Sequence, residues 1–90
     1  MRDYLRERLQ NLGMEVYEDE AGKVLGGEAG NLIAWKPGEL SGPSIFLAAH
    51  MDTVVPGKGV KPVLEGEIIR SSGDTILGGD DKAGIAVILE

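Results

Sequence analysis

Cysteine is absent from this chain, and histidine occurs only once. The lack of cysteine excludes a disulfide framework and a thiolate metal site, which agrees with a cytoplasmic location. No run approaches the roughly 18 apolar residues that a membrane span needs. The charged start Met1-Arg2-Asp3 also differs from a secretory signal peptide. We therefore expect a cytoplasmic protein that does not associate with a membrane.

Positive charge is also in short supply, because 9 Lys and Arg face 15 Asp and Glu, for a net charge of −6. This balance argues against nucleic-acid partners, which are bound through clustered Lys and Arg. The sequence lacks the phosphate-binding P-loop pattern, the alternating Asp/Asn loop of calcium-binding hands and the Gly-x-Ser-x-Gly turn of serine hydrolases. Nucleotide binding, EF-hand calcium binding and serine or cysteine nucleophilic catalysis are thus unsupported.

Ninety residues suffice for one small domain, with Gly at 14 positions marking many tight turns. The spacing of Leu5, Leu9 and Leu12 predicts a helix over residues 2–12. A second helix is predicted over residues 82–90, and it stops at Glu90 as if cut inside the element. Strands are predicted over residues 14–18, 23–27, 31–36, 44–52 and 74–77, with a hairpin at Glu65-Gly66. The expected fold is α/β, with a mixed sheet and a central 44–52 strand.

The first candidate site lies at the end of that central strand, where Ser44–Ala49 leads to His50 and Asp52. In an extended chain, residues two apart project to the same side. His50 is therefore a candidate metal ligand, with Asp52 orienting its ring. The alternatives are a packed core histidine and an aspartate whose side chain ends the strand in an Asx-turn.

The second candidate site is the acidic pair Asp80-Asp81, which follows Gly78-Gly79. Two adjacent carboxylates favour a divalent counter-ion. They also suit the first turn of a helix, where they would do no more than cap it. Lys82 is expected either to pair with one of these carboxylates or to face solvent.

Together, three stretches resemble the two-zinc exopeptidase and aminoacylase family. These are Asn31-Leu-Ile-Ala, Ile45-Phe-Leu-Ala-Ala-His-Met-Asp-Thr-Val and Ile76-Leu-Gly-Gly-Asp-Asp-Lys-Ala-Gly-Ile-Ala. The His-Met-Asp-Thr-Val and Gly-Asp-Asp-Lys-Ala-Gly forms are most similar to the peptidase T-like (tripeptide aminopeptidase) branch. The resemblance implies a zinc-dependent exopeptidase that hydrolyses short peptides, with a three-layer α/β sandwich as its catalytic domain.

Carried over by position, the resemblance implies that His50 binds one zinc ion and that Asp80 bridges two. It implies that Asp52 is the catalytic aspartate behind His50, and that Asp81 follows Asp80 across a cis peptide bond. Mn²⁺ or Co²⁺ could replace zinc, since imidazole and carboxylate ligands accept all three. No substrate-binding residue is assigned. A homo-oligomer is compatible with the resemblance.

The resemblance covers residues 1–90 as the N-terminal portion of a catalytic domain. The family's Glu-Glu pair, its remaining metal ligands, its lid or dimerisation domain and its C-terminal catalytic half have no counterpart here. We therefore expect this chain alone to be inactive. Two alternatives stay open: a non-catalytic truncated or split-frame product that self-associates or pairs with a partner fragment, and an acidic α/β domain that binds a divalent ion structurally.

Overall fold

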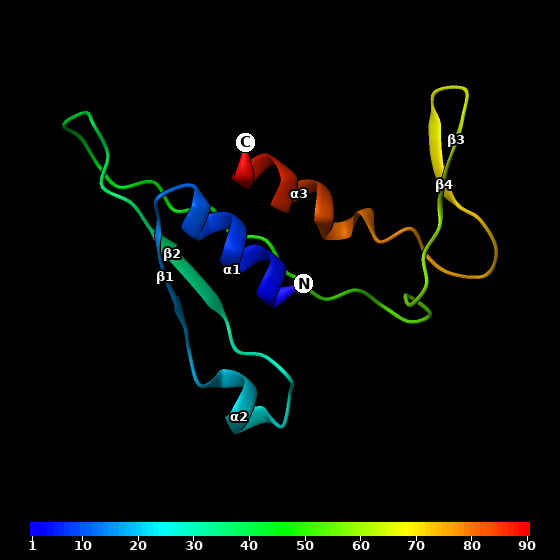
Figure 1. Ribbon diagram of the computed structural model, residues 1–90, viewed down its shortest axis with the longest axis horizontal. Coiled ribbons are helices and arrows are strands. Elements are labelled where there is room, and N and C mark those ends of the chain that lie inside the picture. Colours follow the sequence, from blue (N-terminus) through cyan, green and yellow to red (C-terminus); the bar gives the residue numbers. More distant parts are fainter. The chain divides into compact units, whose positions relative to one another are not determined.

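The computed structural model describes residues 1–90 (Figure 1). The chain divides after Phe46 into two compact units, with Leu89 counted in the first. The first unit contains α1 (Arg2–Asn11), β1 (Glu15–Glu18), α2 (Ala21–Leu25) and β2 (Leu32–Trp35). The second unit contains β3 (Pro62–Glu65), β4 (Ile68–Ser71) and α3 (Gly79–Leu89). The mixture of helices and strands confirms the α/β class. None of the helices has both the length and the apolar character needed to cross a membrane.

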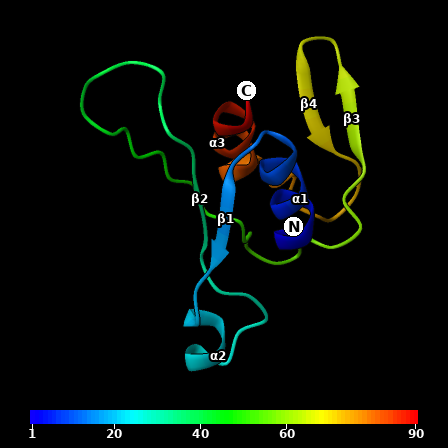
Figure 2. The same cartoon turned by 60° about the vertical axis from the view of Figure 1, so that its left-hand side comes forward.

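In the first unit, α1 packs against an antiparallel pair of strands (Figure 2). β1 and β2 pair from Glu15 opposite Trp35 to Glu18 opposite Leu32. α1 ends where Gly13 turns the chain with φ of +80°, a conformation that glycine adopts without steric cost. Leu5 on α1 is the one buried apolar side chain of the chain, at 6% exposure. The apolar core of this unit is therefore very small.

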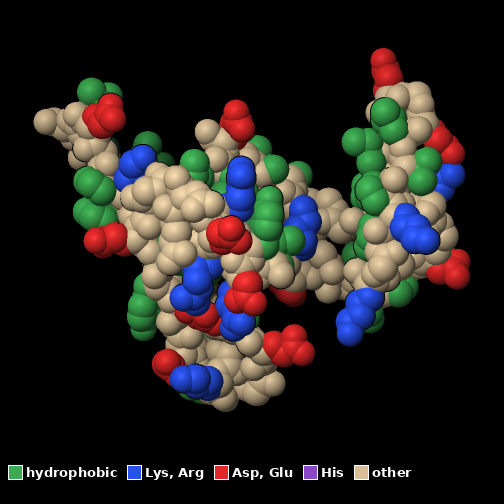
Figure 3. Space-filling model, viewed as in Figure 1, with side chains coloured by type: hydrophobic (Ala, Val, Ile, Leu, Met, Phe, Trp, Pro, Cys, Tyr) green, Lys and Arg blue, Asp and Glu red, His purple; other side chains and the backbone are tan.

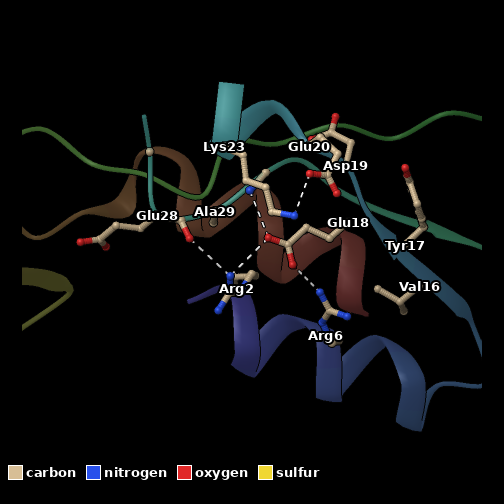
Figure 4. A pocket seen from close by; sticks show the side chains of 13 residues that line it. Arg2, Arg6, Val16, Tyr17, Glu18, Asp19, Glu20, Lys23, Glu28 and Ala29 are labelled. Atoms are coloured by element: carbon tan, nitrogen blue, oxygen red, sulfur yellow. Dashed lines mark hydrogen bonds and ion pairs between the residues drawn. The ribbon is translucent and has the colours of Figure 1, made fainter. Parts of the chain in front are cut away.

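A polar cluster around Glu18 supplements that small core (Figure 4). The Glu18 carboxylate, at the end of β1, accepts hydrogen bonds from Arg2 and Arg6 of α1. It also accepts the backbone N–H of Gly30 at 3.1 Å. The Glu18 side chain is only 20% exposed, so these partners compensate for its partial removal from water. Glu18 thus joins α1, β1 and the loop before β2.

Asp19 organises the loop that follows β1. Its Oδ1 accepts the backbone N–H groups of Ala21 at 3.1 Å and Asn31 at 2.7 Å. Its Oδ2 accepts the Asn31 side-chain amide at 2.8 Å. The bond to Ala21 satisfies a donor at the start of α2, and Gly26 ends this helix in the left-handed conformation with φ of +73°.

The strand predicted over residues 23–27 is therefore wrong, since α2 occupies most of this stretch. The Asp19 hydrogen bond and the left-handed Gly26 favour a single helical turn over an extended chain. By contrast, the structure confirms the helix predicted over 2–12 and the strands predicted over 14–18 and 31–36, with no end displaced by more than one residue.

In the second unit, the predicted hairpin at Glu65-Gly66 is confirmed. β3 and β4 pair antiparallel from Pro62 opposite Ser71 to Glu65 opposite Ile68. Gly66 in the turn has φ of +62°. The helix predicted over 82–90 is also present, as α3.

The strands predicted over residues 44–52 and 74–77 do not form. Both sheets are two-stranded and antiparallel, so the expected mixed sheet is not observed either. A strand needs a neighbour for its backbone N–H and C=O groups, and residues 44–52 have no backbone–backbone hydrogen bonds. Ile45 and Phe46 are 85% and 86% exposed. The apolar run that predicted a buried central strand thus lies open in this chain.

The second unit has no buried residue at all, although it is rich in apolar side chains. Those that are mostly exposed are Leu47, Val54, Val55, Leu64, Ile68, Ile69 and Val87. Apolar side chains are visible along the hairpin in the space-filling view (Figure 3). Burial of such side chains is the main force that stabilises a fold. Within this unit, no element covers that surface.

We predict that Glu18→Gln lowers the thermal stability of the first unit, because a neutral amide cannot form ion pairs with Arg2 and Arg6. The pKa of Glu18 is held below its ordinary value of 4.5, chiefly by the Gly30 N–H and then by Arg2. A lowered pKa stabilises the fold above pH 4.5, and this contribution disappears as pH falls through the lowered pKa.

Thermal unfolding followed by circular dichroism at pH 7 and at pH 3 tests this prediction. The stability gap between the parent chain and Glu18→Gln should narrow at the lower pH. Glu15→Gln is the matched control, because Glu15 lies on the same strand but is exposed. Equal melting temperatures for the parent chain and Glu18→Gln at pH 7 would contradict the proposed role of this cluster.

Candidate functional site

His50 and Asp80, which are 30 positions apart in the sequence, meet in the second unit. The Nε2 atom of His50 lies 3.0 Å from Oδ1 of Asp80. The stretch before His50 belongs to no helix or strand, while Asp80 stands at the start of α3. The structure thus brings together the two residues that the sequence singled out as metal ligands.

The other ring nitrogen of His50 faces Asp52. Nδ1 lies 3.0 Å from the backbone carbonyl oxygen of Asp52 and 3.4 Å from its carboxylate Oδ1. A carbonyl oxygen can only accept, so Nδ1 carries a hydrogen and donates it. The backbone carbonyl of Asp52 is thereby the group that orients the ring. Its side chain is 92% exposed, with one oxygen at the longer distance.

This arrangement leaves two lone pairs facing each other. With the hydrogen of a neutral imidazole on Nδ1, Nε2 carries a lone pair, and the Asp80 carboxylate is likewise an acceptor. A separation of 3.0 Å is favourable only if a proton or a metal cation lies between the two atoms. In the absence of a metal, the pair is therefore an imidazolium–carboxylate ion pair.

The pKa of His50 is accordingly raised above its ordinary value of 6.5. The hydrogen bond to Asp80 is the largest cause, and the one to the Asp52 carbonyl is the next. Both favour the protonated ring and together outweigh the partial removal of the ring from water, which opposes them. The site thus attracts positive charge to the space between His50 and Asp80.

The two adjacent aspartates have different functions. Oδ1 of Asp81 accepts the backbone N–H of Gly84 at 3.0 Å, the hydrogen bond of a helix-capping residue. Asp80 and Asp81 both depart from helical φ and ψ, so the regular part of α3 begins after them. The peptide bond between them is cis, as the family resemblance predicted. Asp81 therefore caps α3, while the Asp80 side chain, 94% exposed, is free to face His50.

Lys82 links α3 to the segment that carries His50. Its ammonium group donates to the Met51 carbonyl oxygen at 2.8 Å, across 31 positions of sequence. The expectation that Lys82 pairs with a neighbouring carboxylate or faces solvent is wrong. No local spacing could have revealed this contact, because its acceptor is a backbone atom in a distant segment.

A hollow of about 380 Å³ adjoins His50 and Asp80. Its other lining residues are Asp52, Thr53, Val54, Ile76, Gly78 and Gly79. The first unit has a larger hollow of about 480 Å³ around Glu18 (Figure 4). Arg2 and Arg6 pair there with Glu18, and Lys23 pairs with Glu20. Because its charged groups pair with one another, this larger hollow is the weaker candidate.

The donors at His50 and Asp80 fit a divalent metal ion. Two atoms that bind one zinc ion at about 2.0–2.2 Å, at angles between about 90° and 110°, lie roughly 3.0–3.4 Å apart. The observed separation of 3.0 Å between Nε2 and Oδ1 is of this size. No group of three His, Cys, Asp or Glu side chains is close enough to hold a metal. The chain therefore supplies two donors, fewer than a complete site needs.

Comparison with known proteins gives matches over nearly the whole chain. The uncharacterised protein YqjE of Bacillus subtilis is 46% identical over 86 residues, which is 96% of this chain and 23% of that protein. The crystal structure of the aminopeptidase PepT from Bacillus cereus matches with a TM-score of 0.91 and 47% identity. That of a tripeptidase from Staphylococcus aureus matches with a TM-score of 0.92 and 45% identity. No family model matches the chain.

The extent of these matches is uneven. Each structural match covers 98% of this chain but only 24% of the other. This chain therefore spans about a quarter of the length of the relatives that it matches.

We predict that Asp80→Asn lowers the pKa of His50 toward 6.5, because a neutral amide no longer stabilises the imidazolium. His50 is the only histidine, so its ring signals in a ¹H NMR titration are assigned without ambiguity. Asp74→Asn, an exposed position in the same unit, is the control and should leave the titration unchanged. An unaltered pKa in Asp80→Asn would show that the two side chains do not meet in solution.

Proposed function

We propose that this chain, which matches one segment of two peptidase T-like proteins in sequence and in fold, supplies part of a metal-dependent centre that hydrolyses short peptides. The observation that supports this most directly is the pair of acceptors, His50 Nε2 and Asp80 Oδ1, at 3.0 Å. A divalent cation between them would satisfy both lone pairs and would replace the proton that otherwise occupies this space.

Each residue of the site has a distinct proposed role. His50 and Asp80 would hold the metal, and the second carboxylate oxygen of Asp80 would be available to a second ion. Asp52 would fix the ring through its backbone carbonyl, and the negative charge of its carboxylate would strengthen His50 as a ligand. Asp81 would stay at the helix cap and take no part in ligation.

Zinc is the metal that we propose, with Mn²⁺ or Co²⁺ as substitutes, because imidazole and carboxylate donors accept all three. When bound, such a metal activates a water molecule and polarises a peptide carbonyl. The chain's own residues would orient the donors, and the Asp52 carbonyl would keep the hydrogen of the neutral ring on Nδ1. The hollow beside them, about 380 Å³, would be the entry for the substrate.

The centre would be completed by residues that this chain does not contain. A catalytic zinc site normally has three protein ligands and an open position for water, whereas two donors meet here. No carboxylate is placed as a general base, since Asp80 faces His50 and Asp81 caps α3. We therefore propose that the chain by itself hydrolyses nothing detectable.

The exposed apolar surface is a second observation, independent of the missing ligands and general base, that supports an incomplete centre. Residues 47–88 include no buried side chain, so the site has no core of its own beneath it. The relatives are about four times longer, which is ample chain to cover this surface. The same surface also favours a second candidate function, in which the chain only pairs with a partner fragment and performs no chemistry.

The substrate class follows from the names of the matched structures, which are an aminopeptidase and a tripeptidase. We propose short peptides with a free amino terminus. The net charge of −6 makes nucleic acid an unsuitable partner. A cytoplasmic location agrees with the absence of cysteine.

A chimera tests the proposed function. In it, residues 1–90 replace the matching quarter of the Bacillus cereus aminopeptidase, to which they are 47% identical. The chimera should bind zinc and cleave a tripeptide, while this chain alone should not. His50→Ala in the chimera should lower the zinc content, because one ligand is lost. Asp52→Asn should keep the metal and lose most turnover, because only the charge behind His50 is removed.

Asp74→Asn in the chimera is the matched control and should change neither quantity. Zinc content is measured by atomic absorption, and turnover by release of the amino-terminal residue. A His50→Ala chimera with full zinc content would remove His50 from the ligand set. A chimera that folds yet holds no zinc would favour the non-catalytic pairing function.

A further inference from the structure

The contact between Lys82 and Met51 lies at the centre of the candidate site. Met51 stands between His50 and Asp52, and Lys82 follows Asp80 by two residues. The Lys82 ammonium group donates to the Met51 carbonyl at 2.8 Å, and the contact is partly buried. This hydrogen bond therefore joins the two segments that carry the proposed ligands.

Few other contacts hold the His50 segment in place. Residues 44–52 lack backbone–backbone hydrogen bonds, and no strand pairs with them. The side-chain atoms of His50 and Asp80 are themselves half or fully exposed. A hydrogen bond from a charged donor is stronger than a neutral one, and partial burial increases its strength. The Lys82 contact is thus the strongest restraint on this segment apart from the ligands themselves.

The rest of α3 is arranged so that Lys82 can make this contact. Asp81 is engaged with the Gly84 N–H, and it forms no ion pair with Lys82. Asp80 faces His50, so Lys82 has no ion pair with that carboxylate either. The ammonium group is consequently available to the Met51 carbonyl, and its positive charge lies outside the space between His50 and Asp80.

We propose that Lys82 is a positioning residue for the metal centre. By binding the Met51 carbonyl, it holds residues 50–52 against the start of α3 and keeps Nε2 of His50 within ligand distance of Asp80 Oδ1. Lys82 touches neither metal nor substrate in this role. The inference rests on the proposed function for its effect on metal affinity, whereas its effect on the His50–Asp80 geometry is independent of any metal.

Three variants of the 90-residue chain test the proposal. Lys82→Met keeps an unbranched apolar stem, one atom shorter than lysine, but removes the donor. Lys82→Arg keeps a charged donor and should preserve the contact. Lys58→Met is the matched control, because Lys58 is an exposed lysine of the same unit whose side chain forms no hydrogen bond or ion pair. Far-ultraviolet circular dichroism establishes that the helices are retained in each variant.

The first measurement is geometric and uses no metal. In the parent chain, NMR should show a nuclear Overhauser effect between the His50 ring and the β-protons of Asp80, and another between the ε-protons of Lys82 and Met51. Lys82→Met should lose the His50–Asp80 signal, while Lys82→Arg and Lys58→Met should retain it. Absence of the Lys82–Met51 signal from the parent chain would overturn the proposal, even if Lys82→Met fails to fold.

The second measurement is zinc affinity by isothermal titration calorimetry, made on the same variants in the Bacillus cereus chimera, because the 90-residue chain supplies only two donors. Loss of a group that orients a ligand typically weakens metal binding by about 10–100-fold. Lys82→Met should show a loss at the lower end of that range, with recovery in Lys82→Arg. Parent-like zinc affinity and an intact His50–Asp80 signal in Lys82→Met would overturn the role of Lys82 and leave the proposed function standing. A parent chain with both NMR signals whose chimera folds but binds no zinc would count against the proposed function alone.

Discussion

The candidate site depends on one electrostatic constraint, which is that an imidazole nitrogen and a carboxylate oxygen cannot stay 3.0 Å apart unless a cation separates them. The Asp52 carbonyl fixes the hydrogen of the His50 ring on the far nitrogen and turns the lone pair of the near one toward Asp80. The pKa of His50 is raised for the same reason, because a proton between the two atoms is favourable. The same geometry therefore suits a protonated ion pair and the metal ion that we propose.

Asp80 and Asp81 make different contacts because of their positions at the start of α3. A helix leaves its first backbone N–H groups without partners, and Asp81 satisfies one of them at Gly84. Gly84 has no side chain, and a Cβ atom there would lie 2.4 Å from the Asp81 carboxylate. The glycine thus leaves room for the cap. With Asp81 committed to the helix, only Asp80 can serve the site.

The two units differ in how they are stabilised. The first has a small core around Leu5, supplemented by the ion pairs and backbone hydrogen bonds of Glu18 and Asp19. The second has a hairpin, a helix and the candidate site, but no buried residue. Its apolar side chains are largely exposed, and only two donors meet at the proposed metal site. The peptidases that match this chain are about four times its length.

Local chemistry determined much of this structure from the sequence alone. Leucine spacing placed α1, alternation placed β1 and β2, and Glu65-Gly66 placed the hairpin, because each signal depends on neighbours within a few residues. The sequence also singled out His50, Asp52 and Asp80 as candidates. The strand predicted over residues 23–27 is wrong, because Asp19 and Gly26 favour a helical turn there. The central strand predicted over residues 44–52 is also wrong, because no other strand of this chain pairs with it.

Tertiary structure alone decided the rest. That Nε2 of His50 meets Asp80 and that Lys82 binds the Met51 carbonyl could not be derived from spacing, and the sequence left open which of Asp80 and Asp81 caps α3. Two of these contacts join residues 30 or more positions apart, and the Lys82 contact ends on a backbone atom that every residue type possesses. The sequence thus determined which side chains could bind a cation, and the three-dimensional fold decided which of them meet.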